Sequence, residues 1–181
     1  MRNRKMKKSH WLICGLIVVG AVIVTAVYSG QNNASVKADQ SQSAAPAAKV
    51  QSQITVQNDF YDFGTIAMKN GLVRQVYKLT NQGQQPITIK KAYTSCMCTK
   101  ANIISQSGKV TGPFGMPGHG GAVSRANVTI QPGEEFSVES VFDPAAHGPS
   151  GIGLANRTIY LETNSSATPK VELKFSVNVT N

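Results

Sequence analysis

The chain has 181 residues, 41% of them hydrophobic, and a formal net charge of +9. Five of its 18 Lys and Arg residues lie within the first eight positions, where there is no acid, and the rest of the chain carries 13 basic and nine acidic residues. The basic residues of this remainder are scattered and form no Arg-rich stretch with interleaved aromatics, so the sequence argues against nucleic acid as a partner.

The first 28 residues are typical of a membrane anchor. Residues 1–10 are basic, and residues 11–28, WLICGLIVVGAVIVTAVY, carry no charge. As a helix this stretch spans roughly 27 Å, close to the thickness of the hydrocarbon core of a bilayer. It is longer than the apolar region of a signal peptide and is followed by a poor cleavage site, which favours an uncleaved single-pass anchor over a cleaved signal. The basic flank then stays in the cytoplasm, and the chain after Tyr28 lies outside, in the periplasm or at the cell surface.

The next segment differs sharply in composition. Residues 29–53 are almost all Gln, Ser, Ala, Asn and Lys. Such a segment buries too little apolar surface to offset the entropy lost on ordering, so we expect a flexible tether. Residues 54–181 remain, which suffice for one domain with its own core.

Short β-prone runs alternate with turn residues throughout 54–181, and no segment has a sustained helical period. In the last run, Val171, Leu173, Phe175, Val177 and Val179 fall on one face and polar residues on the other, as a half-buried antiparallel strand requires. The glycine- and proline-rich stretch TGPFGMPGHGG, residues 111–121, is expected to be a loop. The pattern predicts an all-β, immunoglobulin-like β-sandwich of about seven or eight strands.

Four short motifs in this domain carry a family resemblance. They are Phe63-Gly64-Thr65-Ile66, Asn81-Gln82-Gly83, Ser95-Cys96-Met97-Cys98-Thr99 and Ile130-Gln131-Pro132-Gly133-Glu134. In combination they resemble the DUF1573 family, which is bacterial, usually exported and related to the ASH/Hydin immunoglobulin-like modules. The resemblance implies a fold and a compartment but no settled activity. Two features depart from the family pattern, namely Met97 between the cysteines and the glycine-rich insertions.

The two cysteines allow three kinds of chemistry. If Cys96 and Cys98 occupy alternate positions of a strand, their side chains share a face with Cα atoms ~6.6 Å apart. A disulfide staple is then just possible but strained, and an exchangeable redox pair is conceivable. Convergence of both thiolates on one metal ion requires a smaller adjustment.

The two glycine-rich loops supply further donors for a metal. The first loop contains Met116 and His119, and the second contains His147. Thiolate and thioether sulfur select Cu(I), whereas imidazole suits both copper and zinc. We therefore expect that any ion held by Cys96, Cys98, Met116, His119 and His147 is Cu(I).

The sequence shows no nucleophile elbow, phosphate loop, HExxH or dinucleotide turn, and we expect that the protein is not an enzyme. The first hypothesis is a membrane-anchored binding module that holds Cu(I) through the Cys-Met-Cys strand and the loop residues. The alternative is a structural domain that recognises another envelope protein, with the cysteines as a staple. A thiol–disulfide redox protein ranks third, because the pair lacks the helix N-terminus that lowers a thiol pKa in CxxC proteins.

Overall fold

The computed structural model describes residues 51–119 and 124–181. The predicted basic flank, the membrane anchor and nearly all of the tether lie outside these residues. Within the described ranges, neither of the short helical segments has the length and apolar character needed to cross a bilayer. By their contacts, all of the described residues belong to one unit, Ala45–Asn181.

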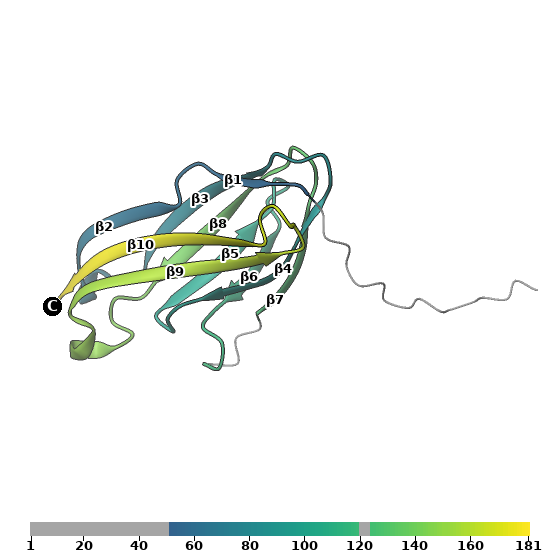
Figure 1. The fold of residues 1–181 in the computed structure, drawn as a ribbon. Coiled ribbons are helices and arrows are strands. Elements are labelled where there is room, and N and C mark those ends of the chain that lie inside the picture. Colours follow the sequence, from purple (N-terminus) through teal and green to yellow (C-terminus); the bar gives the residue numbers. More distant parts are fainter. Residues whose placement is uncertain (1–50, 120–123) are drawn as a thin grey trace, which may run out of the picture. The chain divides into compact units, whose positions relative to one another are not determined.

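The described residues form two five-stranded sheets packed face to face (Figure 1). One sheet has the strand order β1-β3-β8-β5-β6, and the other has the order β2-β10-β9-β4-β7. Neighbouring strands are antiparallel, except that β2 runs parallel to β10. The elements are β1 (Ile54–Val56), β2 (Phe60–Ala67), the 3-10 helix η1 (Met68–Asn70), β3 (Val73–Asn81), β4 (Ile87–Thr94), β5 (Thr99–Ile104), β6 (Val110–Phe114), β7 (Arg125–Ile130), β8 (Glu135–Phe142), the 3-10 helix η2 (Gly148–Gly151), β9 (Gly153–Thr163) and β10 (Lys170–Thr180).

This architecture confirms the predicted all-β sandwich, but the predicted number of strands was too low. The described part of the chain has ten strands, and β6 arises from the beginning of the stretch that the sequence predicted to be a loop. Pro113 interrupts the β pattern there because it has no N–H. Strand β6 lies at the edge of its sheet and pairs only with β5, so the missing donor costs no ladder hydrogen bond on the open side.

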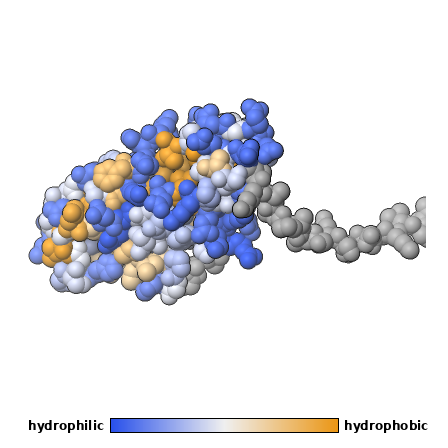
Figure 2. Space-filling view, viewed as in Figure 1, coloured by the Kyte–Doolittle hydropathy of each residue, from blue (hydrophilic) through white to orange (hydrophobic). Residues whose placement is uncertain are grey.

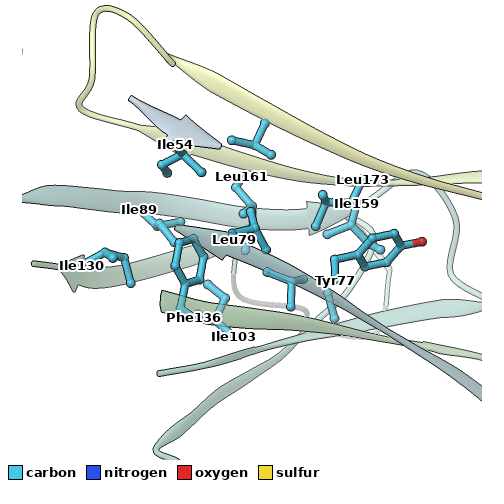
Figure 3. Packing of buried hydrophobic residues seen from close by; sticks show 14 of the residues in the cluster. Ile54, Tyr77, Leu79, Ile89, Ile103, Ile130, Phe136, Ile159, Leu161 and Leu173 are labelled. Atoms are coloured by element: carbon cyan, nitrogen blue, oxygen red, sulfur yellow. The ribbon is translucent and has the colours of Figure 1, made fainter. Parts of the chain in front are cut away.

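The core forms where the inward faces of the two sheets meet. The five alternate apolar residues of β10 are at most 5% exposed, as their period of two predicts. Figure 3 shows side chains such as Leu79 and Phe136 from one sheet directed towards Ile89 and Leu161 from the other. The outward face in Figure 2 is mostly hydrophilic, with separate apolar patches. Alternation along the strands therefore accounts for both the core and the polar surface.

One end of the sandwich is closed by a buried side chain, Asn81, at the end of β3. We call this the Asn81 end; it comprises Asn81 and the loops 82–86, 131–134 and 164–169. The side-chain amide bonds to four backbone groups, three in these loops and one at the end of β7. Nδ2 donates to the carbonyls of Gln85 (3.0 Å), Ile130 (3.2 Å) and Gln131 (3.1 Å), and Oδ1 accepts from the N–H of Gly83 (3.0 Å).

The close packing at this end also leaves no room for a side chain at Gly83. A Cβ atom there would lie 2.2 Å from Cβ of Ser52, so no larger residue fits without moving the chain. The Asn81-Gln82-Gly83 motif and the turn at Gln131–Glu134 meet here, where Gly133 N–H donates to the Asn81 carbonyl at 2.8 Å. Two of the four family motifs are thus explained by closure of the fold.

Candidate metal centre

The two cysteines lie in a tight turn that carries the chain from one sheet to the other. Strand β4 ends at Thr94 in one sheet and β5 begins at Thr99 in the other, and the Thr99 N–H donates to the Cys96 carbonyl at 3.2 Å. The buried Thr94 hydroxyl bonds to the carbonyls of Cys96 (2.9 Å) and Thr99 (3.0 Å). The predicted Cys-Met-Cys strand is therefore wrong, because four residues that cross between the sheets cannot remain extended.

The turn brings the two sulfur atoms closer than a strand would. Cys98 Sγ donates to Cys96 Sγ over 2.7 Å, and both cysteines are free thiols. Cys98 is buried at 3% exposure within the apolar cluster around Phe142 and Phe175, whereas Cys96 is half-buried. One sulfur thus faces the core and the other faces solvent.

His147 reaches this pair from the loop between β8 and β9. Its Nε2 atom lies 3.2 Å from Cys96 Sγ. The loop is fixed at its start by Asp143, whose N–H donates to the Cys98 carbonyl at 2.9 Å and whose Oδ1 accepts from the N–H of Ala145 at 2.9 Å. After His147 the chain turns into η2, where Ser150 Oγ donates to the His147 carbonyl at 2.7 Å. These bonds hold the imidazole-bearing loop against the cysteine turn.

Arg157, which the sequence analysis did not select, completes the group. Its Nε donates to Cys98 Sγ at 3.1 Å, and its Nη1 donates to the Asn156 carbonyl at 2.9 Å. Two hydrogen bonds between Ser95 and Thr158 hold the turn against β9 beside Arg157. The Ser95 N–H donates to the Thr158 carbonyl, and the Thr158 N–H donates to Ser95 Oγ, both at 2.9 Å.

A signal for Arg157 was present in the strand pattern. Every second residue of β9 faces the core, and the buried ones among them are Ala155, Ile159, Leu161 and Thr163. Arg157 lies in this same alternating set, between Ala155 and Ile159. A charged residue in a core-facing position needs a polar or anionic partner, because an unpaired buried charge is costly. The alternation in the sequence was therefore sufficient to single out Arg157, although it did not identify the partner.

The surroundings shift the pKa values of the two thiols in opposite directions. Burial raises the pKa of Cys96, but hydrogen bonds from Cys98 and His147 and the charge of Arg157 outweigh it and lower that pKa to about 7. Burial, followed by the hydrogen bond to Cys96, raises the pKa of Cys98. Cys96 is thus the more acidic of the two thiols, and the S–H of Cys98 donates to it.

The structure places the remaining predicted ligands differently. The ligand atoms of Cys96, Cys98 and His147 all lie within 4.8 Å of one another, and His119 lies outside this group. His119 is exposed in the turn after β6, where its N–H donates to the Met116 carbonyl at 3.3 Å. Met116 is half-buried and follows Gly115, whose carbonyl accepts from Thr94 N–H at 3.2 Å. The first glycine-rich loop therefore starts beside the strand that leads to the cysteines, and residues 120–123 of it lie outside the described residues.

The separation of the sulfurs lies between the values that two chemistries require. A disulfide needs ~2.05 Å, and two thiolates on one tetrahedral ion with bonds of ~2.3 Å are roughly 3.8 Å apart. The observed 2.7 Å can reach either value with a small movement of the half-buried Cys96. Two sulfurs and one imidazole nitrogen form the one group of three or more metal-ligating His, Cys, Asp or Glu side chains in residues 51–119 and 124–181.

The comparisons with known proteins agree with the fold. Residues 54–111 match the family described as "Protein of unknown function (DUF1573)", which confirms the resemblance seen in the sequence. No curated protein matches the chain.

Solved structures similar to this chain include a protein of unknown function from Porphyromonas gingivalis W83, with a TM-score of 0.51 and 16% identity over 75% of this chain and 50% of that one. The chain thus spans half the length of that protein. The VesB protease of Vibrio cholerae has a TM-score of 0.46 and 16% identity over 70% of this chain and 32% of its own. The ASH/PapD-like domain 7 of human CEP192 has a TM-score of 0.41 and 14% identity over 76% and 89%. At 16% identity, the likeness to the Porphyromonas protein describes the fold alone.

Proposed function

We propose that this protein is an extracytoplasmic immunoglobulin-like binding module that holds one Cu(I) ion between Cys96, Cys98 and His147. The observation that carries the proposal is the approach of His147 Nε2 to 3.2 Å from Cys96 Sγ, over 51 residues of sequence. A staple between Cys96 and Cys98 needs no histidine, whereas a metal ion with two thiolate ligands gains a third from it.

The donor set suits a soft ion. Two thiolates and an imidazole bind Cu(I) or Zn(II) well, and hard cations prefer carboxylate and carbonyl oxygen. The acidity of Cys96 also favours metal binding, because metals bind the thiolate and the pKa of this thiol is lowered to about 7. Met116 is a further soft donor on a loop that starts beside β4, and it fits copper better than zinc.

The location of the module forms part of the same proposal. The basic flank and the apolar stretch 11–28 support a single-pass anchor with the cytoplasm at the N-terminus, and the long polar segment 29–53 would give the domain reach from the membrane. An outward-facing domain of this kind receives or delivers its ion at the cell envelope. An envelope protein is then the expected partner.

The test is a titration of the full-length protein carrying Cys14→Ser, so that Cys96 and Cys98 are its only thiols. Anaerobic competition with a chromogenic Cu(I) chelator should give one ion per chain. The double variant Cys96→Ser/Cys98→Ser should lose this binding, and His147→Ala should weaken it by about tenfold or more, the equivalent of one lost ligand.

Matched controls separate the site from the rest of the chain. Met97→Leu alters the exposed thioether between the two cysteines, and His119→Ala alters a histidine outside the group; each should change the affinity by less than about threefold. Met116→Leu measures whether the first loop adds a ligand. Absence of stoichiometric binding, or binding that survives loss of both cysteines, would end the proposal.

A second candidate is thiol–disulfide exchange, and a specific observation favours it. The site combines a half-buried thiol whose pKa is lowered to about 7 with a fully buried second thiol 2.7 Å away. Arg157 and His147 supply here the stabilisation of the thiolate that a helix N-terminus supplies in CxxC proteins. Turnover of a disulfide substrate that depends on both cysteines, in protein that takes up no Cu(I), would make this the function.

A further inference from the structure

The position of Arg157 next to the sulfur pair has a consequence for the charge of the ion. The guanidinium Nε is 3.1 Å from Cys98 Sγ, and the side chain is held by its second bond to the Asn156 carbonyl. Arg157 stays protonated under all ordinary conditions. A metal ion bonded to Cys98 at ~2.3 Å would therefore sit at most about 5.4 Å from a fixed positive charge.

The charges that contact the sulfurs can be counted with each kind of ion present. Two thiolates carry two negative charges, Arg157 carries one positive charge, and His147 as a ligand is neutral. A singly charged ion brings this inner group to zero, whereas a doubly charged ion leaves an excess of one positive charge. The carboxylate of Asp143 is not counted with this inner group, because its Oδ1 accepts from the N–H of Ala145 in its own loop.

This excess charge is unfavourable at the observed burial. Cys98 lies in the core cluster, and the inward register of β9 places Arg157 against the same cluster through its pairing with Phe175. Charges near apolar surroundings interact more strongly than in water, so an uncompensated charge is penalised. Without the metal, the Arg157 Nε–H has Cys98 Sγ as its acceptor and Nη1 has the Asn156 carbonyl, which explains why a cation is tolerated in this position.

We infer that Arg157 sets the charge preference of the site, so that the Cys96–Cys98–His147 group selects a singly charged soft ion over a doubly charged one. The inference rests on the proposed function and adds the residue that discriminates by charge between ions that both bind thiolate sulfur. Arg157 is a specificity-determining residue in this scheme and is not itself a ligand.

The experiment compares Ag(I) with Cd(II), two soft ions that differ in charge and do not change oxidation state. Both affinities are measured by chelator competition on the full-length Cys14→Ser protein and on three variants. Arg157→Gln removes the charge, Arg157→Lys retains it, and Arg125→Gln removes a charge from β7, where Arg125 pairs with Lys91. The ratio of the Cd(II) to the Ag(I) affinity is the quantity of interest, because effects of the variant on thiol ionisation apply to both ions and cancel.

Arg157→Gln should raise this ratio by about tenfold, the change expected for one unit of charge at this distance in a partly exposed site. Arg157→Lys and Arg125→Gln should leave the ratio within about threefold of the parent value. If Arg157→Gln does not fold, Arg157→Met, which keeps an unbranched apolar stem, replaces it.

The outcomes distinguish the two proposals. If the parent protein binds neither ion, the proposed function fails. If it binds both and Arg157→Gln leaves the ratio unchanged, the role of Arg157 is overturned while the metal site stands. If Arg157→Lys raises the ratio as much as Arg157→Gln, the cause is not charge, and the inference is overturned as well.

Discussion

The two ends of the sandwich both bring polar side chains to a place where loops converge, but they do so in opposite ways. At the Asn81 end, neutral groups bond to backbone atoms: Asn81 is fully buried and is bonded to four of them, and Ser165 Oγ donates to the Ser52 carbonyl. At the cysteine end, which comprises the turn 95–98, the loop 143–152 and Arg157, ionisable side chains bond to one another.

This difference separates closure of the fold from chemistry. In residues 51–119 and 124–181 no buried side-chain nitrogen or oxygen lacks a partner, so the Asn81 end is complete as it stands. At the cysteine end, Cys98 Sγ donates to Cys96 Sγ, Cys96 is half-buried and His147 is exposed. The motif around Asn81 therefore closes the fold, whereas the motif around Cys96 brings together the ionisable side chains of the proposed site.

The largest effect is expected from Asn81→Ala. The change removes four hydrogen bonds, each of which contributes about 1 kcal/mol, so the free energy of unfolding should fall by about 3 kcal/mol or more. The carbonyls of Gln85 and Gln131 keep a second donor, Ser52 Oγ and the Glu134 N–H. Urea unfolding followed by circular dichroism measures it. Asn178→Ala, on the exposed side of β10, is the matched control and should cost less than about 0.5 kcal/mol. A loss below about 1 kcal/mol for Asn81→Ala would contradict the division between the two ends.

The next effect is stabilisation by the ion. Free Cu(I) at a hundred times its dissociation constant should raise the free energy of unfolding by about 2.7 kcal/mol, because only the folded chain brings the three ligands together. The measurement is anaerobic urea unfolding with and without buffered Cu(I). The Cys96→Ser/Cys98→Ser variant should show no stabilisation, while Asn81→Ala, if folded, should show the same increment. An equal gain in the double variant would place the ion elsewhere.

A smaller effect is expected from oxidising the cysteine pair. A bridge between Cys96 and Cys98 closes a loop of three residues, for which the chain-entropy relation gives at most about 1.6 kcal/mol, against about 4.7 kcal/mol for a loop of 100 residues. Comparison of urea unfolding for oxidised and reduced protein, in the Cys14→Ser background, tests this. If reduction alone abolished cooperative unfolding, the result would support the alternative in which the cysteines form a structural disulfide.

The smallest effect is on thiol reactivity in the metal-free protein. Because the thiolate is the nucleophile and the pKa of Cys96 is lowered to about 7, its alkylation rate should rise with a midpoint near pH 7 and level off above it. At pH 7 the thiolate fraction is about fifty times that of an ordinary thiol of pKa 9, but the lower basicity reduces the gain in rate to about sixfold. Mass spectrometry after iodoacetamide treatment over a pH series locates the midpoint. Arg157→Gln should move it upward; a midpoint near 9 in the parent protein would show that the surroundings do not stabilise the thiolate.

The sequence by itself determined the sandwich and most of its core. Period-two alternation, as in β10, depends only on neighbours along the chain, and therefore it is readable without knowing which strands pair. It undercounted the strands because Pro113 and the glycines around it hide β6, which is tolerated only as an edge strand, and edge position follows from pairing across the sheet.

The tertiary structure alone decided the composition of the site. The sequence offered His119 and His147 on equal terms, and only the packing of the loop 143–152 against the turn 95–98 brings His147 to the sulfurs. The pairing of β9 with β4 and β10 likewise fixes Arg157 beside Cys98, 59 residues away. Contacts at such separations depend on sheet register and on where the chain crosses between sheets, and no local pattern in the sequence encodes either.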